Sequence, residues 1–367
     1  MISTKSRTRA FLGAVAATAM AAAMPTASAA DVSFAGQTVD FTIPFSETGG
    51  SARWAQFYAP LLSEHLPGNP TVVVRYRPGG GSTTGANWFQ DNQQLNDGTQ
   101  IFGTSGSTQF PYLLGDPRVR YEYQDWIPLL GSGVGGVAYL SGDLADKWDG
   151  TGDNLQDEFF MYGSQGATSL DLVALLAFKL IGLDVEPIFG VEGRGDGRLM
   201  FERGETNLDY QTTPAYISNV QPMVDQGLAV PLFAWGSLDD DGNIVRDPTF
   251  PDIPSFAEVC EANSVCDTDS LGFEAWQAFF TAGFPAQKLI YLPGTASDEV
   301  VEAYREGLRD LMARDDFTEI SEAALGIYPQ LIDNGARNAH RLATTISPEA
   351  KQYVLDWLEE DYQITLD

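Results

Sequence analysis

The sequence predicts an α/β protein built from two domains, and three observations support this. Short segments rich in β-branched residues alternate with amphipathic segments, which is typical of a parallel sheet covered by helices on both faces. The alternation occurs twice, in residues 39–107 and again in residues 159–236. The chain has 367 residues, which is more than one hydrophobic core usually holds.

The first run opens with a strand and a helix that differ in hydrophobic period. Residues 39–45 (VDFTIPF) read as a strand, and residues 51–66 place Trp54, Tyr58 and Leu62 at helical spacing. The elements expected next are a strand at 71–76, a helix at 83–92, a strand at 99–105 and a helix that begins near residue 107.

The second run repeats this pattern and is followed by helical segments. The expected elements are a strand at 159–164, a long helix at 169–183, strands at 185–190, 207–212 and 228–236, and helical stretches at 304–326 and 347–362. The segment 129–154, rich in Gly and Asp, is a candidate hinge between the runs, and 237–272 is an acidic, Pro-rich insertion.

The N-terminal residues 1–29 have the organisation of an export signal. Lys5, Arg7 and Arg9 form a basic start, a short apolar stretch follows, and Ala27-Ser28-Ala29 is a small-residue cleavage site. The apolar stretch is shorter than the roughly 20 residues needed to span a bilayer. We therefore expect a soluble protein that is exported to the periplasm.

Charge and composition narrow the classes of partner and chemistry. The formal net charge of −29 disfavours nucleic acid and anionic membranes as partners and indicates a solvated acidic surface. Cys260 and Cys266 are expected to form a disulfide in an oxidising compartment, rather than a free or metal-binding pair. His65 and His340 are the two histidines, so we expect no catalytic metal and no cofactor.

Turns made of glycines and hydroxyl residues follow successive strands. They are PFSETGGSARW (44–54), RYRPGGGSTTG (75–85), GTSGSTQ (103–109) and YGSQGATS (162–169). Each lies where a strand ends and a helix opens, which is the ligand-binding edge of open α/β sheets. The first turn of a helix offers unpaired N–H groups and a positive dipole end, and glycine allows close approach. The pattern predicts a bound anion, a carboxylate in particular.

Three other motifs are given structural readings. GSGVGG (131–136) fits a dinucleotide fingerprint, but a strand-like segment follows it where a helix is required. SLDDDGN (237–243) lacks the closing Glu of a calcium loop and reads as an acidic turn. GRGDG (193–197) is expected at the surface, with Arg194 reaching a ligand as the alternative.

The segments FTIPFSETGGSARW (41–54), RYRPGGGSTTGA (75–86), DGTQIF (97–102) and YGSQGATS (162–169), in their order, resemble the Bug/TctC family of extracytoplasmic solute-binding proteins of tripartite tricarboxylate transporters. The resemblance rests also on GDP…WIPLLG (115–131), PIFGVEGRGDGRLMFERGETNLDY (187–210), FPDIPSFAEV (250–259) and WQAFFTAGFPA (276–286). It covers about residues 38–330 and implies a type II periplasmic binding-protein fold, with two α/β domains and a ligand cleft between them. The boundaries it suggests are 30–133, 134–250 and a return to the first domain at 251–367.

The family resemblance also implies the ligand-binding residues, which would hold a carboxylate through backbone N–H groups and hydroxyls. The first two loops would act as pincers, and Phe45 and Tyr210 would form an aromatic wall. The set is Phe45, Ser46, Glu47, Thr48, Gly49, Gly50, Ser51, Arg53, Arg77, Pro78, Gly79, Gly80, Gly81, Ser82, Ser105, Ser107, Ser164, Gln165, Gly166, Ala167, Thr168, Gly190, Val191, Tyr210, Gln211 and Thr212.

The expected function is capture of a small organic anion, such as a dicarboxylate, tricarboxylate, aromatic acid or sugar acid, by hinge closure. The resemblance implies the membrane subunits of a tripartite tricarboxylate transporter as partners, and we expect a monomer. Arg53 stands where the family usually has an acid, so it either adds a cation to the pocket or points to solvent. The alternative is a secreted enzyme acting on an acidic or sugar substrate, although no nucleophile with a base is evident.

Overall fold

The structure is a computed structural model that describes Met1, residues 32–239 and residues 243–366. The expected export signal lies outside the described residues, apart from Met1, and part of the acidic turn at 237–243 does as well. The strands are β1 Thr38–Ile43, β2 Thr71–Tyr76, β3 Gln100–Gly103, β4 Ile127–Ser132, β5 Gly136–Ser141, β6 Phe159–Ser164, β7 Asp184–Phe189, β8 Leu208–Thr212, β9 Ala229–Ala234, β10 Ser237–Leu238, β11 Ile244–Val245, β12 Lys288–Leu292 and β13 Gln330–Ile332.

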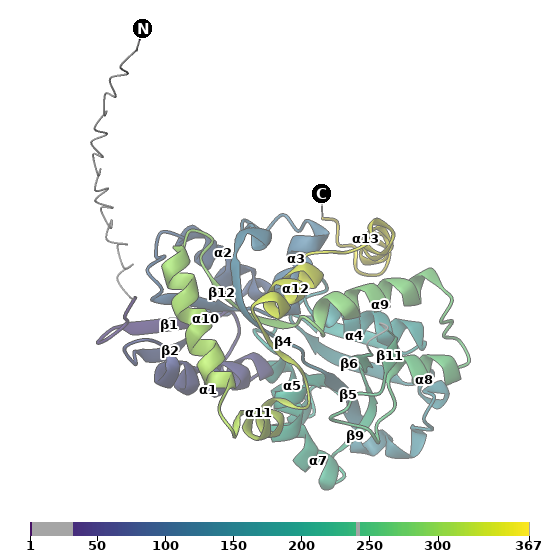
Figure 1. Ribbon diagram of the computed structural model, residues 1–367. Coiled ribbons are helices and arrows are strands. Elements are labelled where there is room, and N and C mark those ends of the chain that lie inside the picture. The colour runs from purple at the N-terminus through teal and green to yellow at the C-terminus, as the bar shows by residue number, and fades with distance from the viewer. Residues whose placement is uncertain (2–31, 240–242, 367) are drawn as a thin grey trace. The chain divides into compact units, whose positions relative to one another are not determined.

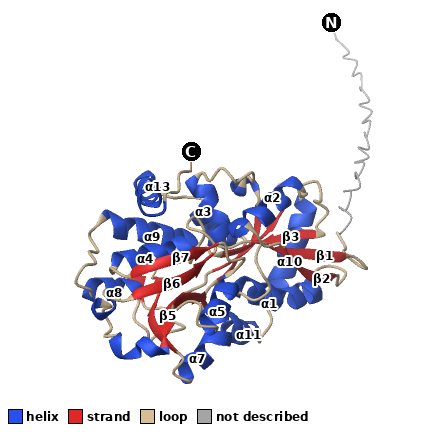
Figure 2. Cartoon of the chain, turned by 180° about the vertical axis from the view of Figure 1, so that it is seen from behind, coloured by secondary structure: helices blue, strands red, loops and turns tan. Residues whose placement is uncertain are grey.

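Helices follow most strands and lie beside the sheets (Figure 2). They are α1 Gly50–His65, α2 Thr83–Asp91, α3 Gly106–Leu114, α4 Asp171–Leu180, α5 Arg194–Glu202, α6 Thr213–Ala215, α7 Gln221–Asp225, α8 Phe256–Ala262, α9 Leu271–Gly283, α10 Asp298–Met312, α11 Phe317–Leu325, α12 Asn334–Ala343 and α13 Pro348–Tyr362.

The described strands form two larger sheets and one short hairpin. The first sheet has the order β13-β4-β12-β3-β1-β2, the second has the order β7-β6-β8-β5-β9, and β10 pairs with β11. Residues 133–135 connect β4 of the first sheet to β5 of the second. The α/β class with two sheets is therefore confirmed.

Both sheets are mixed, whereas the sequence predicted parallel ones. β1 runs parallel to β2 and β3, but β12 is antiparallel to both β3 and β4. In the second sheet β6 is parallel to β7 and β8, and β5 is antiparallel to β8 and β9. The antiparallel strands are those by which the chain passes from one sheet to the other, so the local alternation of strand and helix could not reveal them.

Strands β12 and β13 come late in the chain, yet they pair in the sheet that contains β1 to β4 (Figure 1). The chain thus leaves the first sheet after β4, builds the second, and returns. The domain boundaries inferred from the family resemblance stay a prediction, although this strand order is compatible with them.

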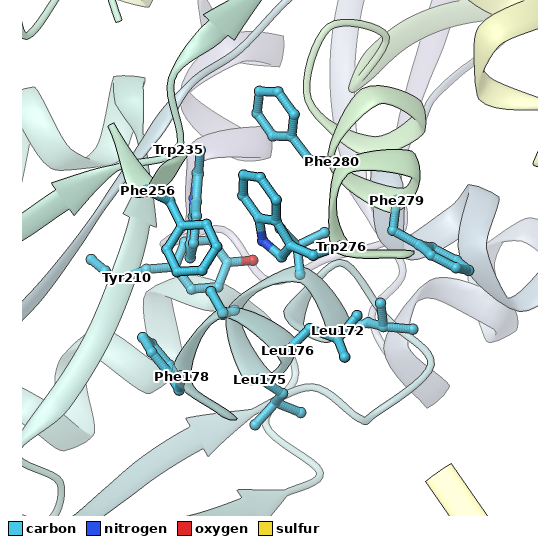
Figure 3. Packing of buried hydrophobic residues seen from close by; sticks show 14 of the residues in the cluster. Leu172, Leu175, Leu176, Phe178, Tyr210, Trp235, Phe256, Trp276, Phe279 and Phe280 are labelled. Carbon is cyan, nitrogen blue, oxygen red and sulfur yellow. The ribbon is translucent and has the colours of Figure 1, made fainter. Parts of the chain in front are cut away.

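The largest hydrophobic cluster joins the second sheet to α4, α9 and α13. Trp276 of α9 packs against Phe256 of α8 with ring centroids 4.4 Å apart and stacks on Phe280 at 5.3 Å. Figure 3 shows these rings beside Leu172 and Leu176 of α4. Aromatic pairs of this kind add about 0.5–1.5 kcal/mol each to the burial of their area. This packing holds α4 in place. The residues just before α4 belong to the candidate site.

Candidate functional site

The loop between β1 and α1 lies against the start of α5. Thr48 Oγ1 donates to Asp196 Oδ1 at 3.5 Å, and it lies 3.2 Å from the hydroxyl of Ser46. A Cβ added to Gly195 would lie 2.4 Å from the carbonyl carbon of Thr48, so only glycine permits this approach. A loop of the first sheet and a helix start of the second are therefore in direct contact.

A small cavity of about 20 Å³ lies beside this contact. A space of this size holds about one water molecule. The lining comes from both sheets and contains no Asp or Glu. It consists of Phe45, Gly49, Gly50, Ser51, Ser105, Gln165, Leu170, Gly193, Arg194, Thr212 and Lys288.

The first turn of α1 faces this cavity through Gly50 and Ser51. The N-cap residue is Gly49, which has no side chain and makes no capping hydrogen bond. The first amides of a helix have no acceptor within the helix, and its N-terminus carries a partial positive charge. The glycines predicted for an anion cradle therefore place a positive helix end at the cavity.

Two buried polar side chains in the lining lack hydrogen-bond partners among the described residues. They are the Gln165 amide nitrogen and the Thr212 hydroxyl, on residues that are 7% and 3% exposed. Leaving a buried donor unsatisfied costs about 1–3 kcal/mol. Both groups can donate a hydrogen bond, and an anion accepts hydrogen bonds, so their placement suits a negatively charged ligand.

Lys288, the first residue of β12, also lines the cavity and was missed by the sequence analysis. It is 1% exposed, and its ammonium donates to Ser51 Oγ at 3.0 Å. Burial lowers the pKa of Lys288 from 10.5 to about 7. The only local feature that could have pointed to Lys288 is a single lysine at the start of an apolar segment (KLIYL). The local sequence does not indicate which strand this segment pairs with.

A second cavity, of about 490 Å³, is also lined by Gln165. Phe189, Val191, Ile364 and Leu366 give it an apolar wall. Nine of the predicted residues line it: Gly79, Gly80, Gly81, Gln165, Gly166, Ala167, Thr168, Gly190 and Val191.

The loop Gly79–Ser82 has the backbone conformation that its glycines allow. The φ angles of Gly79, Gly80 and Gly81 are +125°, +59° and +64°, and Ser82 follows at +97°. Positive φ disfavours residues with a Cβ. The turn brings backbone to the edge of the larger cavity, and Ser82 itself points inward to Thr108, with 2.7 Å between the hydroxyl oxygens.

Several predicted residues line neither cavity and have structural partners instead. Ser107 accepts from the Leu170 amide at 3.0 Å, and Ser164 donates to Asp171 at 3.0 Å. Arg77 is exposed and stacks on Trp88 at 3.8 Å. The full set outside both linings is Ser46, Glu47, Thr48, Arg53, Arg77, Pro78, Ser82, Ser107, Ser164, Tyr210 and Gln211.

This geometry does not support Arg53 as a cation of the pocket or Tyr210 as part of an aromatic wall. Arg53 is exposed on α1, so its solvent-facing alternative holds. Tyr210 is fully buried in the core and donates to Asp171 Oδ1 at 3.0 Å. Thr212, two residues later at the end of β8, lines the small cavity instead.

Arg194 of the GRGDG segment is buried, which corrects the expectation of a surface segment. Its guanidinium bonds to Asp209, lies 3.3 Å from Asp171 Oδ2, and rests on the rings of Tyr162 and Tyr210. Burial disfavours the charged form of Arg194, but attraction to Asp171 and to the neighbouring tyrosine hydroxyls outweighs this and raises its pKa. Arg194 touches the small cavity, yet two carboxylates already balance its charge.

The remaining motifs have structural roles. Cys260 and Cys266 form the predicted disulfide, with a Cα–Cα distance of 5.1 Å. The GSGVGG segment is followed by strand β5, as expected, so no helix N-terminus is available there for a pyrophosphate. His65 contacts the Leu61 carbonyl at 2.9 Å at the end of α1. Among the described residues, no helix is long and apolar enough to cross a membrane.

Comparisons with known proteins agree with the two-sheet fold. No family model matches the chain, and no curated protein matches its sequence. Solved structures do match in fold, among them BugD, MatC and Rpa4515. BugD, a periplasmic binding protein, has a TM-score of 0.62 and 20% identity, with 88% of this chain and 95% of BugD covered. MatC (Rpa3494) from Rhodopseudomonas palustris, with bound malate, has a TM-score of 0.63, 14% identity and coverages of 86% and 98%.

Rpa4515 from R. palustris, with adipate, has a TM-score of 0.59, 16% identity and coverages of 88% and 95%. The match spans nearly the whole of each of these proteins, so the likeness is not confined to one sheet. The resemblance seen in the sequence is thereby confirmed at the level of fold. The chain has the two-domain α/β fold of periplasmic binding proteins such as BugD.

Proposed function

We propose that this chain is an exported solute-binding protein of the Bug/TctC type that captures a small carboxylate in the periplasm. The observation that carries the proposal is the small cavity at the N-terminus of α1. Its lining supplies unpartnered donors and a buried ammonium, and it contains no carboxylate. That chemistry suits an organic anion, and the fold is that of proteins that bind such anions.

The solved neighbours support the ligand class. MatC binds malate and Rpa4515 binds adipate. Both of these acids carry carboxylate groups on a short carbon chain. Here the carboxylate would lie at the first turn of α1, and the rest of the molecule would extend toward the larger, mostly apolar cavity. The residues predicted from the family resemblance as pincers remain a proposal in this scheme.

The available donors are sufficient for useful affinity. A hydrogen bond to a charged group contributes on the order of 1.5–3 kcal/mol. Four or five such bonds, less the cost of immobilising the ligand, reach the roughly 8 kcal/mol that micromolar binding requires. Salt confines the field of the acidic surface to about 10 Å at 0.1 M ionic strength, so local donors decide the outcome.

In this proposal the signal at residues 1–29 directs export. The protein acts as a monomer and delivers its ligand to the membrane subunits of a tripartite tricarboxylate transporter. Hinge closure between two lobes would trap the ligand. One lobe would consist of about residues 30–133 and 251–367, and the other of about residues 134–250. A secreted enzyme is the alternative, but we favour a receptor because the solved neighbours are binding proteins.

The test is a thermal-shift screen over organic acids, followed by calorimetry and analysis of the recovered ligand. The expected result is a rise of several degrees in Tm with one class of carboxylate, no rise with the corresponding amide, and recovery of the ligand unchanged. Conversion of the ligand would establish an enzyme. Absence of any shift across dicarboxylates, tricarboxylates, aromatic acids and sugar acids would refute the proposal.

A further inference from the structure

Lys288 is a buried cation without an anionic partner among the described residues. Within the part of the chain that the structure describes, the Lys288 ammonium donates to the neutral Ser51 hydroxyl and forms no ion pair. Burying a charge is costly unless that charge is paired. Since Lys288 also lines the small cavity, together with two donors that lack partners among the described residues, the missing partner belongs in that cavity.

The described residues that line the small cavity with Lys288 include no carboxylate that could serve as this partner. On β12 it lies opposite Ser132 of β4, and neither β3 nor β4 carries a titratable residue. On α1, Arg53 is exposed, and Tyr58 donates to Gln330 at 2.6 Å. Further along β12, Tyr291 contacts His340 of α12 at 2.8 Å.

The other cations near the two cavities are already neutralised. Arg194 pairs with Asp171 and Asp209, and Arg118 pairs with Asp116 at the larger cavity. Lys288 therefore supplies the unbalanced positive charge of the small cavity.

We propose that Lys288 forms a direct ion pair with a carboxylate group of the bound solute and so makes the site selective for anions over neutral analogues. This inference rests on the proposed function and assigns the cation of that site. The ammonium donates to a carboxylate oxygen, the first-turn amides of α1 donate to the same group, and Ser51 retains its position beside both.

The proposal has a consequence for pH. Because burial lowers the pKa of Lys288 to about 7 in the unliganded protein, the ammonium loses its proton above neutrality. A bound carboxylate favours the charged form and raises this pKa. Affinity for the anion should therefore be constant below about pH 7 and fall by up to tenfold per unit as pH rises above it. Burial lowers the pKa of His340, so its titration lies below this window.

The experiment compares the full exported chain with its Lys288→Met and Lys288→Gln variants by calorimetry. The probes are malate, adipate and whichever acid gives the largest thermal shift. Lys147→Met is the matched control, because it removes the same charge from an exposed pair with Glu158. Loss of a buried charge partner predicts Kd values at least about 30-fold higher in both Lys288 variants, with Lys147→Met unchanged.

A second readout follows Kd between pH 6 and pH 9. The wild-type protein should weaken above pH 7, and Lys288→Met should show no such dependence. Equal binding by wild-type and Lys288→Met, with the same pH profile, would overturn the role of Lys288 while leaving the receptor function intact. A wild-type protein that binds none of the acids would overturn the proposed function and this inference together.

Discussion

The most unusual single residue is Lys288, whose charge is unfavourable for the unliganded fold. Burial lowers its pKa to about 7, whereas a lysine in an unfolded chain titrates near 10.4. Between these values the unfolded state binds more protons than the folded state, so this group makes stability rise with pH. A buried cation that weakens the fold is typical of a functional site.

Replacing this lysine should therefore stabilise the unliganded protein. Near pH 7 the free energy of unfolding of Lys288→Met should exceed that of wild type by several kcal/mol. This difference should shrink by about 1.4 kcal/mol per pH unit toward pH 10. Denaturant unfolding of both proteins at several pH values checks this. A destabilised Lys288→Met protein, or a difference independent of pH, would mean that the ammonium is already well compensated.

Gly50 is the second residue with a specific expectation. A Cβ at this position would lie 2.0 Å from Thr212 Oγ1. Gly50→Ala should displace Thr212 or the start of α1 and weaken carboxylate binding by tenfold or more, because both line the small cavity. Calorimetry of Gly50→Ala and of Gly50→Ala/Thr212→Ala measures this, and the second substitution should restore part of the affinity by removing the clash.

At the scale of elements, α5 is anchored by its own first residue. Arg194 joins the helix to β8 through Asp209 and to α4 through Asp171. Arg194→Ala leaves these acids buried without their partner, and it should cost about 3–5 kcal/mol of unfolding free energy. Arg203→Ala, which breaks an exposed pair with Glu205 in the residues after α5, should cost less than about 1 kcal/mol.

Chemical denaturation of the two arginine variants supplies the comparison. Near-equal losses of unfolding free energy in the two variants would show that the ion pairs of Arg194 stabilise the fold no more than a surface pair does. In that case Arg194 would be free to serve the ligand, contrary to its placement here.

The elements also show how far the sequence could be read. The limits expected for the strands at 71–76 and 159–164 match β2 and β6, because β-branched or aromatic runs there end in glycines or hydroxyl residues. The helical stretch 304–326 is divided between α10 and α11. β12 and β13 were not predicted, since their pairing with β4 joins segments more than 150 residues apart.

The same limit applies to the candidate site. The turns after β1 and β6 could be found from glycines and hydroxyls, because those residue types report local backbone needs. The contribution of Lys288 could not, since its burial depends on Ser51, which lies 237 positions away in the sequence. Arg53 was predicted as a site residue because it follows the glycine turn after β1. Its position on α1 directs its side chain to solvent.

At the scale of the molecule, the contact between the first-sheet loop and α5 should report on opening and closing. A Cβ at Gly193 would lie 2.6 Å from Ser46 Oγ, so side chains at these two positions are in direct contact. We expect Ser46→Cys/Gly193→Cys to form a disulfide that holds the two lobes together. The oxidised variant should bind and release malate at least tenfold more slowly than wild type.

Reduction of the engineered disulfide should restore the exchange rate. Because Cys260 and Cys266 are also bonded, wild-type protein treated with the same reductant is the control. Stopped-flow binding measures both states. Unchanged exchange in the oxidised variant would show that the ligand reaches the cavity without separation of these loops.

The most direct measurement of the central claim is a crystal structure of the protein with the carboxylate that produces the largest thermal shift. The account predicts a carboxylate group within hydrogen-bonding distance of the Ser51 amide and the Lys288 ammonium, with Gln165 or Thr212 completing its contacts. A ligand seated elsewhere, with Lys288 still bonded to Ser51 alone, would contradict it.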